Sequence, residues 1–498
     1  MLGVINVVQL GSFGRKVTPP EEFRVNIIKD PKIEDIEKSR IDLLILYRGV
    51  SQEEFDFYSE KLDAYRLIIS ENVDLDEDEL TYQLFENKVG DHLTNDEIRA
   101  FLKDDIRYYF NSVPGDRLTA KDILVSENFE GKVKWNGNDS LELKGDYGDD
   151  FKQILFWPSN IRIESNMIKD FWLEYECDDT VQISIYATKF PVGSIGDTDA
   201  SWHYNQAQID EGFKITNFAE DGNLFISLSA KGHGKLIIKA LHHRYSREDR
   251  GVIDLGGNRR ILPNREEILY YFNPVNFKPP LNVYFSQYTS QEVFDNKSLL
   301  ESFGHPYLII SDQRGSGGQY YVGSKKYEKE IIDIIRECLD ILQFKKDQMI
   351  FSGFSMGAFG ALYYGSKLLP HAVIVGKPLV NLGTVALNEK AIFDSELDST
   401  LDLLNRFSKD EDAVEKLNNK FWEEFDKADW GKSKIAVAYM IDDEYDPDAY
   451  KMLQEHLDDQ GAIIYGKGVA GRHNDDNGTV GNWFIGQYRE ILRNEFDK

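Results

Sequence analysis

Six short apolar runs follow one another through the C-terminal half of this chain. Helical segments such as 325–342 and 358–369 separate the runs, which are LNVYF (281–285), YLIIS (307–311), QMIFSG (348–353), AVIVG (372–376), KIAVAYMI (434–441) and AIIYG (462–466). Strands without alternating polar residues are buried on both faces, and when they alternate with helices they form a parallel sheet. We therefore expect an α/β domain built on a parallel sheet over residues 261–498.

Two further domains are expected ahead of this sheet, because 498 residues exceed what one hydrophobic core usually holds. Residues 119–260 contain β-rich runs separated by turn-forming stretches such as WNGND and KGDYGDD, which is typical of an antiparallel β-sandwich. Residues 1–118 combine apolar runs such as INVVQL and IDLLILY with amphipathic segments over 51–70 and 94–110. That combination predicts a small N-terminal α/β domain with two helices over those segments.

Carbohydrate binding is one function that the expected sandwich could have, because such domains use aromatic platforms for sugars. Four tryptophans are available for this role, although packing in the core is the more ordinary role for each: Trp135, Trp157, Trp172 and Trp202. The sequence leaves the choice open.

A formal charge of −28 and only two cysteines narrow the possible functions. A chain this negative is repelled by nucleic acid and by anionic lipid, so neither is expected as a main partner. Cys177 and Cys338 fall in different expected domains, which argues against disulfides and against a structural zinc site. No signal peptide or membrane-spanning run is recognisable. We expect a cytoplasmic protein without a metal or cofactor.

The segment Gly353-Phe354-Ser355-Met356-Gly357 has the pattern G-x-S-x-G. This pattern places a serine on a tight turn between a strand and a helix, where glycines let neighbouring backbones approach closely. The helix after the turn directs its positive end towards a developing anion. An apolar run precedes the motif and a helix rich in small residues follows it. We predict that Ser355 is the nucleophile of an α/β-hydrolase-type domain.

A serine nucleophile needs a base, and in this fold the acid and the histidine follow the serine in that order. Of the nine histidines, only His456 and His473 follow the acidic cluster that comes after the run 434–441. His456 has the periodicity of a helix surface, whereas His473 lies in a glycine-rich loop before a final helix over 481–496. We predict that His473 is the base.

The acid of the triad has three candidates within one short cluster, Asp443, Glu444 and Asp446. Its role is to hold the imidazole in one tautomer and to stabilise the imidazolium. Asp446 precedes Pro447, an acid–proline pairing that is common in hydrolases, so the residues alone favour Asp446 without excluding the others.

The tetrahedral oxyanion of acyl transfer needs two N–H donors. One is expected from the backbone of Met356, directly after the nucleophile. The other is expected from the loop that follows the run 281–285, where Gln287 can donate from its backbone or its side chain.

A glycine-rich turn over 315–318 follows the run 307–311. It lacks the lysine of a P-loop and the spacing of a dinucleotide fingerprint. We expect it to be a loop at the mouth of the active site.

Taken together, the chain resembles the second accessory secretory protein of the accessory Sec system of streptococci, staphylococci and lactobacilli. The resemblance covers essentially the whole chain, and its most specific segments are GFSMGAFGALYYG (353–365), IDDEYDP (441–447) and GRHNDDNG (471–478). It implies a triad of Ser355, Glu444 and His473, which favours Glu444 over Asp446. Gln287 stands where a small residue is usual in an oxyanion loop.

The resemblance also implies two activities. One is O-acetylation of N-acetylglucosamine on serine-rich-repeat adhesins, and the other is export of those adhesins. The implied partners are the first and third accessory secretory proteins and the motor ATPase of the same system, and the implied location is cytoplasmic or peripheral at the translocase. Two alternatives stay open: a carbohydrate esterase with a sugar-binding sandwich, and a non-catalytic secretion chaperone.

Overall fold

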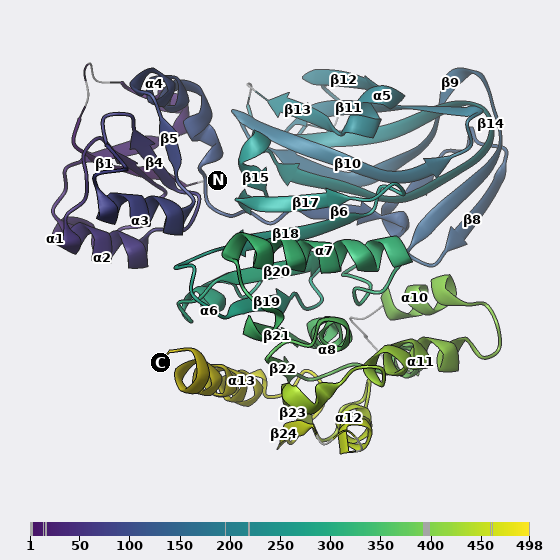
Figure 1. The fold of residues 1–498 in the computed structure, drawn as a ribbon. Helices are drawn as coiled ribbons and strands as arrows, with labels where there is room; N and C mark the ends of the chain where they lie inside the picture. The colour runs from purple at the N-terminus through teal and green to yellow at the C-terminus, as the bar shows by residue number, and fades with distance from the viewer. Residues whose placement is uncertain are drawn as a thin grey trace.

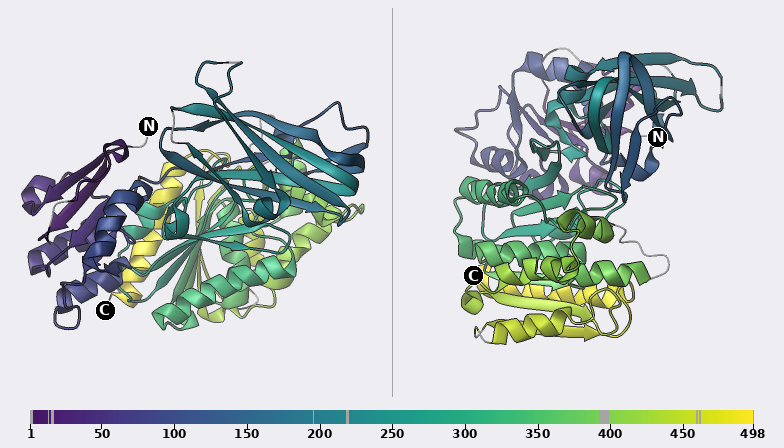
Figure 2. Two further views of the ribbon diagram at one scale, coloured as in Figure 1. Left: turned by 90° about the horizontal axis from the view of Figure 1, so that it is seen from above. Right: turned by 90° about the vertical axis from the view of Figure 1, so that its right-hand side faces the viewer.

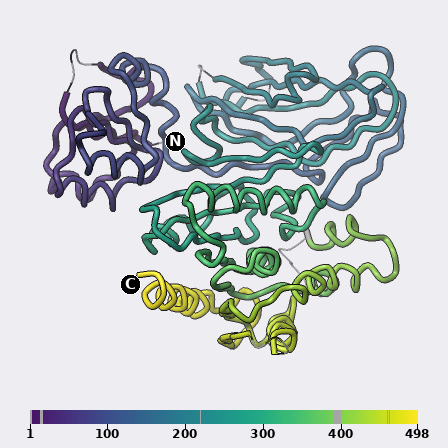
Figure 3. Tube along the Cα trace, in the orientation of Figure 1, coloured from purple at the N-terminus to yellow at the C-terminus, as the bar shows by residue number. Residues whose placement is uncertain are grey.

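The structure is a computed structural model that describes residues 3–12, 14, 17–194, 196–217, 220–391, 399–458, 460 and 462–497. Three large sheets follow one another along the described chain (Figure 1). The first two sheets lie on the same side of the third, as the trace in Figure 3 and the right-hand view in Figure 2 show. The fold is therefore a mixed α/β fold with parallel and antiparallel sheets.

The N-terminal sheet is parallel and has the strand order β2-β1-β3-β4-β5. Its elements are β1 (Ile5–Leu10), β2 (Val25–Lys29), α1 (Ile33–Ile36), β3 (Leu43–Leu46), α2 (Gln52–Lys61), β4 (Leu67–Ser70), α3 (Glu79–Lys88), β5 (Asp91–Leu93) and α4 (Asn95–Asp104). The prediction of a helix over 51–70 is wrong beyond Lys61, because the backbone adopts an extended conformation at Leu62 and the chain then continues into β4. All four residues of β4 are buried, which suits a central strand and not an amphipathic helix.

The second sheet is antiparallel and has nine strands. They are β6 (Asp116–Thr119), β7 (Leu124–Val125), β8 (Lys132–Asn136), β9 (Ser140–Ile163), β10 (Met167–Cys177), β11 (Val181–Pro191), β12 (Ala200–Asn205), β13 (Phe213–Asn217) and β14 (Gly222–Tyr245), with α5 (Gln206–Glu211) inserted. The expected turn KGDYGDD lies inside β9, where glycines and register shifts between β9 and β14 let two 24-residue strands bend without ending.

The four tryptophans of this sheet have different surroundings. Trp157 is buried in its core, and Trp202 is half-buried against the same core. Trp172 is buried outside that core, where its indole N–H donates to the carbonyl oxygen of Arg265 and its ring lies against the Arg265 guanidinium. Trp135 is 45% exposed and is the most exposed of the four.

The third sheet has the order β17-β18-β20-β19-β21-β22-β23-β24, with β17 and β18 antiparallel and the remaining strands parallel. Its strands are β17 (Gly257–Ile261), β18 (Glu267–Asn273), β19 (Leu281–Phe285), β20 (Tyr307–Asp312), β21 (Met349–Phe354), β22 (Ala372–Gly376), β23 (Lys434–Met440) and β24 (Ile463–Val469). The last six cover the six apolar runs seen in the sequence, except for one terminal residue in each of three runs, Gln348, Ile441 and Ala462.

Helices cover both faces of the third sheet. Successive side chains along its strands point to opposite faces, so each strand contributes to two hydrophobic cores. Val283 and Phe285 of β19 pack in the core formed with α7 (Lys325–Leu342), α8 (Met356–Leu368), α11 (Ala413–Phe425) and α12 (Ala449–Asp458). Tyr284 faces the other core, with α6 (Lys297–Glu301) and α13 (Asn477–Ile491). The helices α9 (Leu382–Ala391) and α10 (Ser399–Phe407) complete the set.

Candidate active site

Ser355 lies on a sharp turn between β21 and α8, with φ 51° and ψ −116°. A non-glycine residue seldom adopts a positive φ, so the surrounding turn has to hold it there. The flanking glycines explain how: a Cβ on Gly353 would lie 2.3 Å from the carbonyl oxygen of Gly357, and a Cβ on Gly357 would lie 2.1 Å from that of Phe285. The backbones pack too closely for any side chain, and the serine hydroxyl is left facing a pocket.

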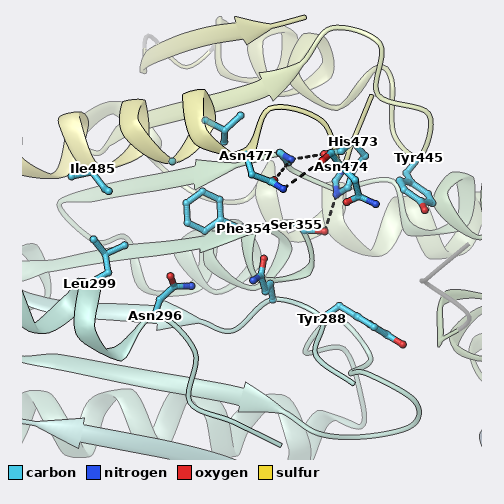
Figure 4. A pocket seen from close by; sticks show the side chains of 14 residues that line it. Tyr288, Asn296, Leu299, Phe354, Ser355, Tyr445, His473, Asn474, Asn477 and Ile485 are labelled. Carbon is cyan, nitrogen blue, oxygen red and sulfur yellow. Dashed lines mark hydrogen bonds between the residues drawn. The ribbon is translucent and has the colours of Figure 1, made fainter. Parts of the chain in front are cut away.

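His473 reaches Ser355 from the loop between β24 and α13, and Figure 4 shows the contact. Its Nε2 lies 2.9 Å from Ser355 Oγ, and its Nδ1 lies 2.7 Å from Asp443 Oδ2. The imidazole and the carboxylate are both buried. Burial alone would raise the pKa of Asp443, but its hydrogen bond to His473 and the backbone N–H groups of Tyr445 and Asp446 hold that pKa below its usual value. Asp443 is thus kept as a carboxylate beside the imidazole.

The two acids favoured by the sequence make other contacts. Glu444 accepts the backbone N–H of His473 at 2.7 Å and pairs with Arg472 at 3.0 Å. It therefore contacts the main chain of the histidine, whereas Asp443 contacts the ring. The three carboxylates differ because the turn after β23 points successive side chains in different directions.

Asp446 is buried and belongs to a separate cluster. Its carboxylate accepts the backbone N–H groups of Val380 and Asn381, each at 2.8 Å, and the side-chain amide of Asn381 at 2.9 Å. Burial raises the pKa of Asp446 to about 6, against the effect of these hydrogen bonds. Asp446 fastens the loop after β22 to the loop after β23 and does not touch His473.

Lys377 was not suggested by any sequence motif, yet it anchors the histidine loop. Its ammonium group donates to the carbonyl oxygen of His473 at 2.5 Å, to that of Asp475 at 3.2 Å and to the side chain of Asn477 at 2.5 Å. Burial lowers the pKa of Lys377, although nearby acids oppose that effect. A single lysine directly after β22 would not have been recognised from sequence spacing.

A pocket of about 480 Å³ opens in front of Ser355 and His473. Gln287 and Tyr288 line it from the loop after β19, and the Gln287 side chain is exposed to it. Met356 begins α8, where the first backbone N–H groups of a helix have no partner within the helix. The backbone of Gln287 hydrogen-bonds to buried Asp295, which leaves the Gln287 side chain as the group free to face the pocket. Gln287 thus lines the same pocket as Ser355, and Met356 follows the serine at the start of α8.

The glycine-rich turn at 315–318 lies behind the pocket. A Cβ on Gly317 would meet the ring of Tyr288 at 1.8 Å, so the turn supports a residue that lines the pocket. Arg117, from β6 of the second sheet, donates to the carbonyl oxygens of Thr289, Gly315 and Ser316 at 2.7–2.9 Å. The antiparallel domain therefore holds both loops at this side of the site.

A buried charge cluster makes a second link between the antiparallel domain and the Gln287 loop. His242 Nδ1 lies 2.5 Å from Glu292 Oε1, and its Nε2 lies 3.2 Å from Glu174. Arg244 pairs with Glu292 and Glu267. Burial lowers the pKa of His242, but Glu292 and Glu174 outweigh it and raise the pKa to about 9. Sequence inspection missed this cluster, whose members are up to 118 positions apart.

We expect the melting temperature of the protein to depend on whether His242 is protonated. Because its folded pKa exceeds its ordinary 6.5, protonated His242 stabilises the fold fully below pH 6.5, and this contribution is lost as pH rises through about 9. A His242→Gln variant should melt below the wild type at pH 6 and approach it near pH 10. His203→Gln, at an exposed histidine of β12, is the matched control. A difference in melting temperature between the wild type and His242→Gln that stays constant from pH 6 to 10 would contradict this assignment.

Two features are absent from the residues that the structure describes. No helix among them is long and apolar enough to span a bilayer. Within the same residues, no group of three or more histidine, cysteine, aspartate or glutamate side chains is placed to bind a metal ion.

Comparison with known proteins gives consistent matches over most of the chain. A family model described as "Accessory Sec system GspB-transporter" matches residues 21–498. The accessory Sec system protein of this family from Staphylococcus aureus (strain NCTC 8325 / PS 47) is 37% identical over 391 residues, 78% of this chain and 75% of the relative. Its Streptococcus gordonii counterpart is 38% identical over 393 residues, 78% and 76% of the two chains.

A solved structure is also similar over nearly the full length. It is a chain of the Glycosylation Associate Protein (Gap123) complex from Streptococcus agalactiae, with a TM-score of 0.86 and 32% identity. The match covers 99% of this chain and 98% of that one. The three-sheet architecture is therefore shared with a protein that was solved as part of a complex.

Proposed function

Because this chain belongs to the family of the second accessory secretory protein of the accessory Sec system, we propose that it is a serine-dependent O-acetyltransferase that also supports adhesin export. The observation that carries the catalytic part is the continuous contact from Ser355 through His473 to Asp443. The order of the third sheet, with serine, acid and histidine after β21, β23 and β24, supports an α/β-hydrolase-type domain.

The proposed reaction has two halves. Ser355 Oγ attacks the carbonyl carbon of an acetyl donor while His473 Nε2 takes the serine proton and then gives it to the leaving group. In the second half, His473 takes a proton from a sugar hydroxyl, which attacks the acetyl-enzyme and receives the acetyl group. Asp443 holds the imidazole with its Nδ1–H directed to the carboxylate, so that Nε2 is free to accept.

The oxyanion of each half-reaction is assigned to the backbone N–H of Met356 and the side-chain amide of Gln287. We expect Gln287→Ala to lower kcat by about a hundredfold with little change in KM, because the lost hydrogen bond forms only in the transition state. Gln291→Ala is a matched control, since Gln291 is an exposed residue of the same loop that does not line the pocket. Equal kinetics of Gln287→Ala and wild type in an ester-hydrolysis assay would remove Gln287 from this role.

The proposed partners are the first and third accessory secretory proteins, the accessory motor ATPase and the glycan of a serine-rich-repeat adhesin. The similarity to a chain of the Gap123 complex supports assembly with the first two. The formal charge of −28 makes nucleic acid an unfavourable partner. A cytoplasmic site of action, at or near the translocase, suits these partners.

A transfer assay tests the proposal. The chain would be incubated with p-nitrophenyl acetate and a serine-rich peptide that carries N-acetylglucosamine, and the glycopeptide would be analysed by mass spectrometry. The proposal predicts an acetyl group on the sugar. Release of free acetate without acetylation of the sugar would support the carbohydrate esterase instead. If the protein neither cleaved the ester nor acetylated the sugar, the non-catalytic chaperone would be the function that remains.

A further inference from the structure

The pocket in front of Ser355 has two chemically different sides. Figure 4 shows His473, Asn474 and Tyr445 on one side of Ser355, with Phe354, Leu299 and Ile485 on the other, where Asn296 and Asn477 lie at the edge of the apolar residues. The first side is polar and aromatic, and the Tyr445 ring meets the His473 ring edge to face at a centroid distance of 5.2 Å. The second side, which we call the apolar arm, consists of Leu299 from α6, Phe354 from β21, and Val480, Gly481 and Ile485 from α13.

The position of His473 decides which part of a substrate enters which side. The histidine has to protonate the leaving group and later deprotonate the acceptor that replaces it. Both groups therefore lie on the His473 side, where exposed Asn474 offers a hydrogen-bonding group to a sugar and buried Tyr445 supports the His473 ring. The acyl group that stays on Ser355 points away from His473, towards the apolar arm.

The apolar arm is larger than a methyl group requires. Leu299, Phe354 and Ile485 are all partly exposed hydrophobic residues that pack on the core between the sheet and α13. Gly481 lies one turn before Ile485 on the same face of α13, and a Cβ at Gly481 would meet no atom within 4 Å. An acetyl group would leave this space open, whereas a longer chain would fill it.

Resting on the proposed function, we infer that the site accepts esters or thioesters whose acyl chain is longer than acetyl and extends into the apolar arm. The step balances as an ordinary acyl transfer. The bond from Ser355 Oγ to the acyl carbon forms, the C–O or C–S bond of the donor breaks, and the serine proton leaves with the donor's oxygen or sulfur by way of His473.

Chain-length profiles of the full chain test the inference, with p-nitrophenyl acetate, butyrate and hexanoate as probes. We expect kcat/KM to rise about tenfold from acetate to butyrate, because each buried methylene favours the transition state by up to about fourfold. A Gly481→Leu variant, which narrows the arm from a helical position with open space, should remove that preference by lowering butyrate and hexanoate turnover more than acetate turnover. Gly486→Leu is the matched control: Gly486 is on the same helix, has no atom near its Cβ and does not line the pocket.

The outcomes separate the inference from the proposed function. The inference would be wrong if p-nitrophenyl acetate were the best substrate of the wild type, or if Gly481→Leu lowered kcat/KM equally on all three esters. In either case, turnover of the acetate ester would still support the proposed function. No turnover of any ester by the folded wild type would overturn both. Retention of the butyrate preference in Gly486→Leu, together with its loss in Gly481→Leu, supports the inference.

Discussion

Replacing Ser355 with alanine should reduce acyl transfer by at least about a thousandfold and leave complex formation unchanged. The loss follows because neither the pocket nor the oxyanion donors can supply the missing covalent step. Alanine removes one oxygen from a turn whose shape depends on Gly353 and Gly357, so the fold should persist. The measurement is the rate of sugar acetylation, with circular dichroism as the check on folding.

The same variant separates catalysis from export. If the two activities are independent, Ser355→Ala should still co-purify with the first and third accessory secretory proteins and still support adhesin export. Acetylation at the wild-type rate in Ser355→Ala would contradict the assigned nucleophile. Loss of both complex and acetylation in a folded variant would show that the activities are not separable.

Replacing Asp443 with asparagine should lower kcat by about 10³- to 10⁴-fold. Asparagine keeps an oxygen for the N–H groups of Tyr445 and Asp446, but it directs an amide N–H towards His473 Nδ1. That donor favours the tautomer in which Nε2 carries the proton, and such a histidine cannot accept the proton of Ser355. Steady-state ester hydrolysis measures the effect.

Glu444→Gln is the matched comparison for this prediction. Glutamine keeps an oxygen that can accept the backbone N–H of His473, so we expect kcat within about tenfold of the wild type. The reverse ranking, with Glu444→Gln far slower than Asp443→Asn, would return the acid to Glu444. The two variants thus decide between the residue implied by family resemblance and the residue in contact with the ring.

The parallel sheet was predictable because its strands are buried on both faces and leave continuous apolar runs. The bounds of β19 and β22 coincide with two of those runs. The second half of the segment 51–70 was misassigned because RLIIS is too short and too apolar to distinguish a buried strand from a helix end. The segment KGDYGDD was misassigned because glycines that end a strand elsewhere bend one here.

Ser355 and His473 could be proposed as nucleophile and base from motif and chain order, but the acid could not be chosen that way. Asp443, Glu444 and Asp446 lie within four residues, and the turn geometry determines which one meets the ring. The support from Arg117 and from the cluster around His242 depends on contacts between domains, which leave no local pattern in the sequence.

The central claim is that Ser355 is an activated nucleophile. The most direct measurement treats the full chain with a fluorophosphonate probe and locates the label by peptide mass spectrometry. The account predicts one label, on Ser355, and little labelling in a His473→Gln variant, because without the base the hydroxyl is a weak nucleophile. A folded protein with no label on Ser355, or with the same labelling rate when His473 is replaced, would contradict it.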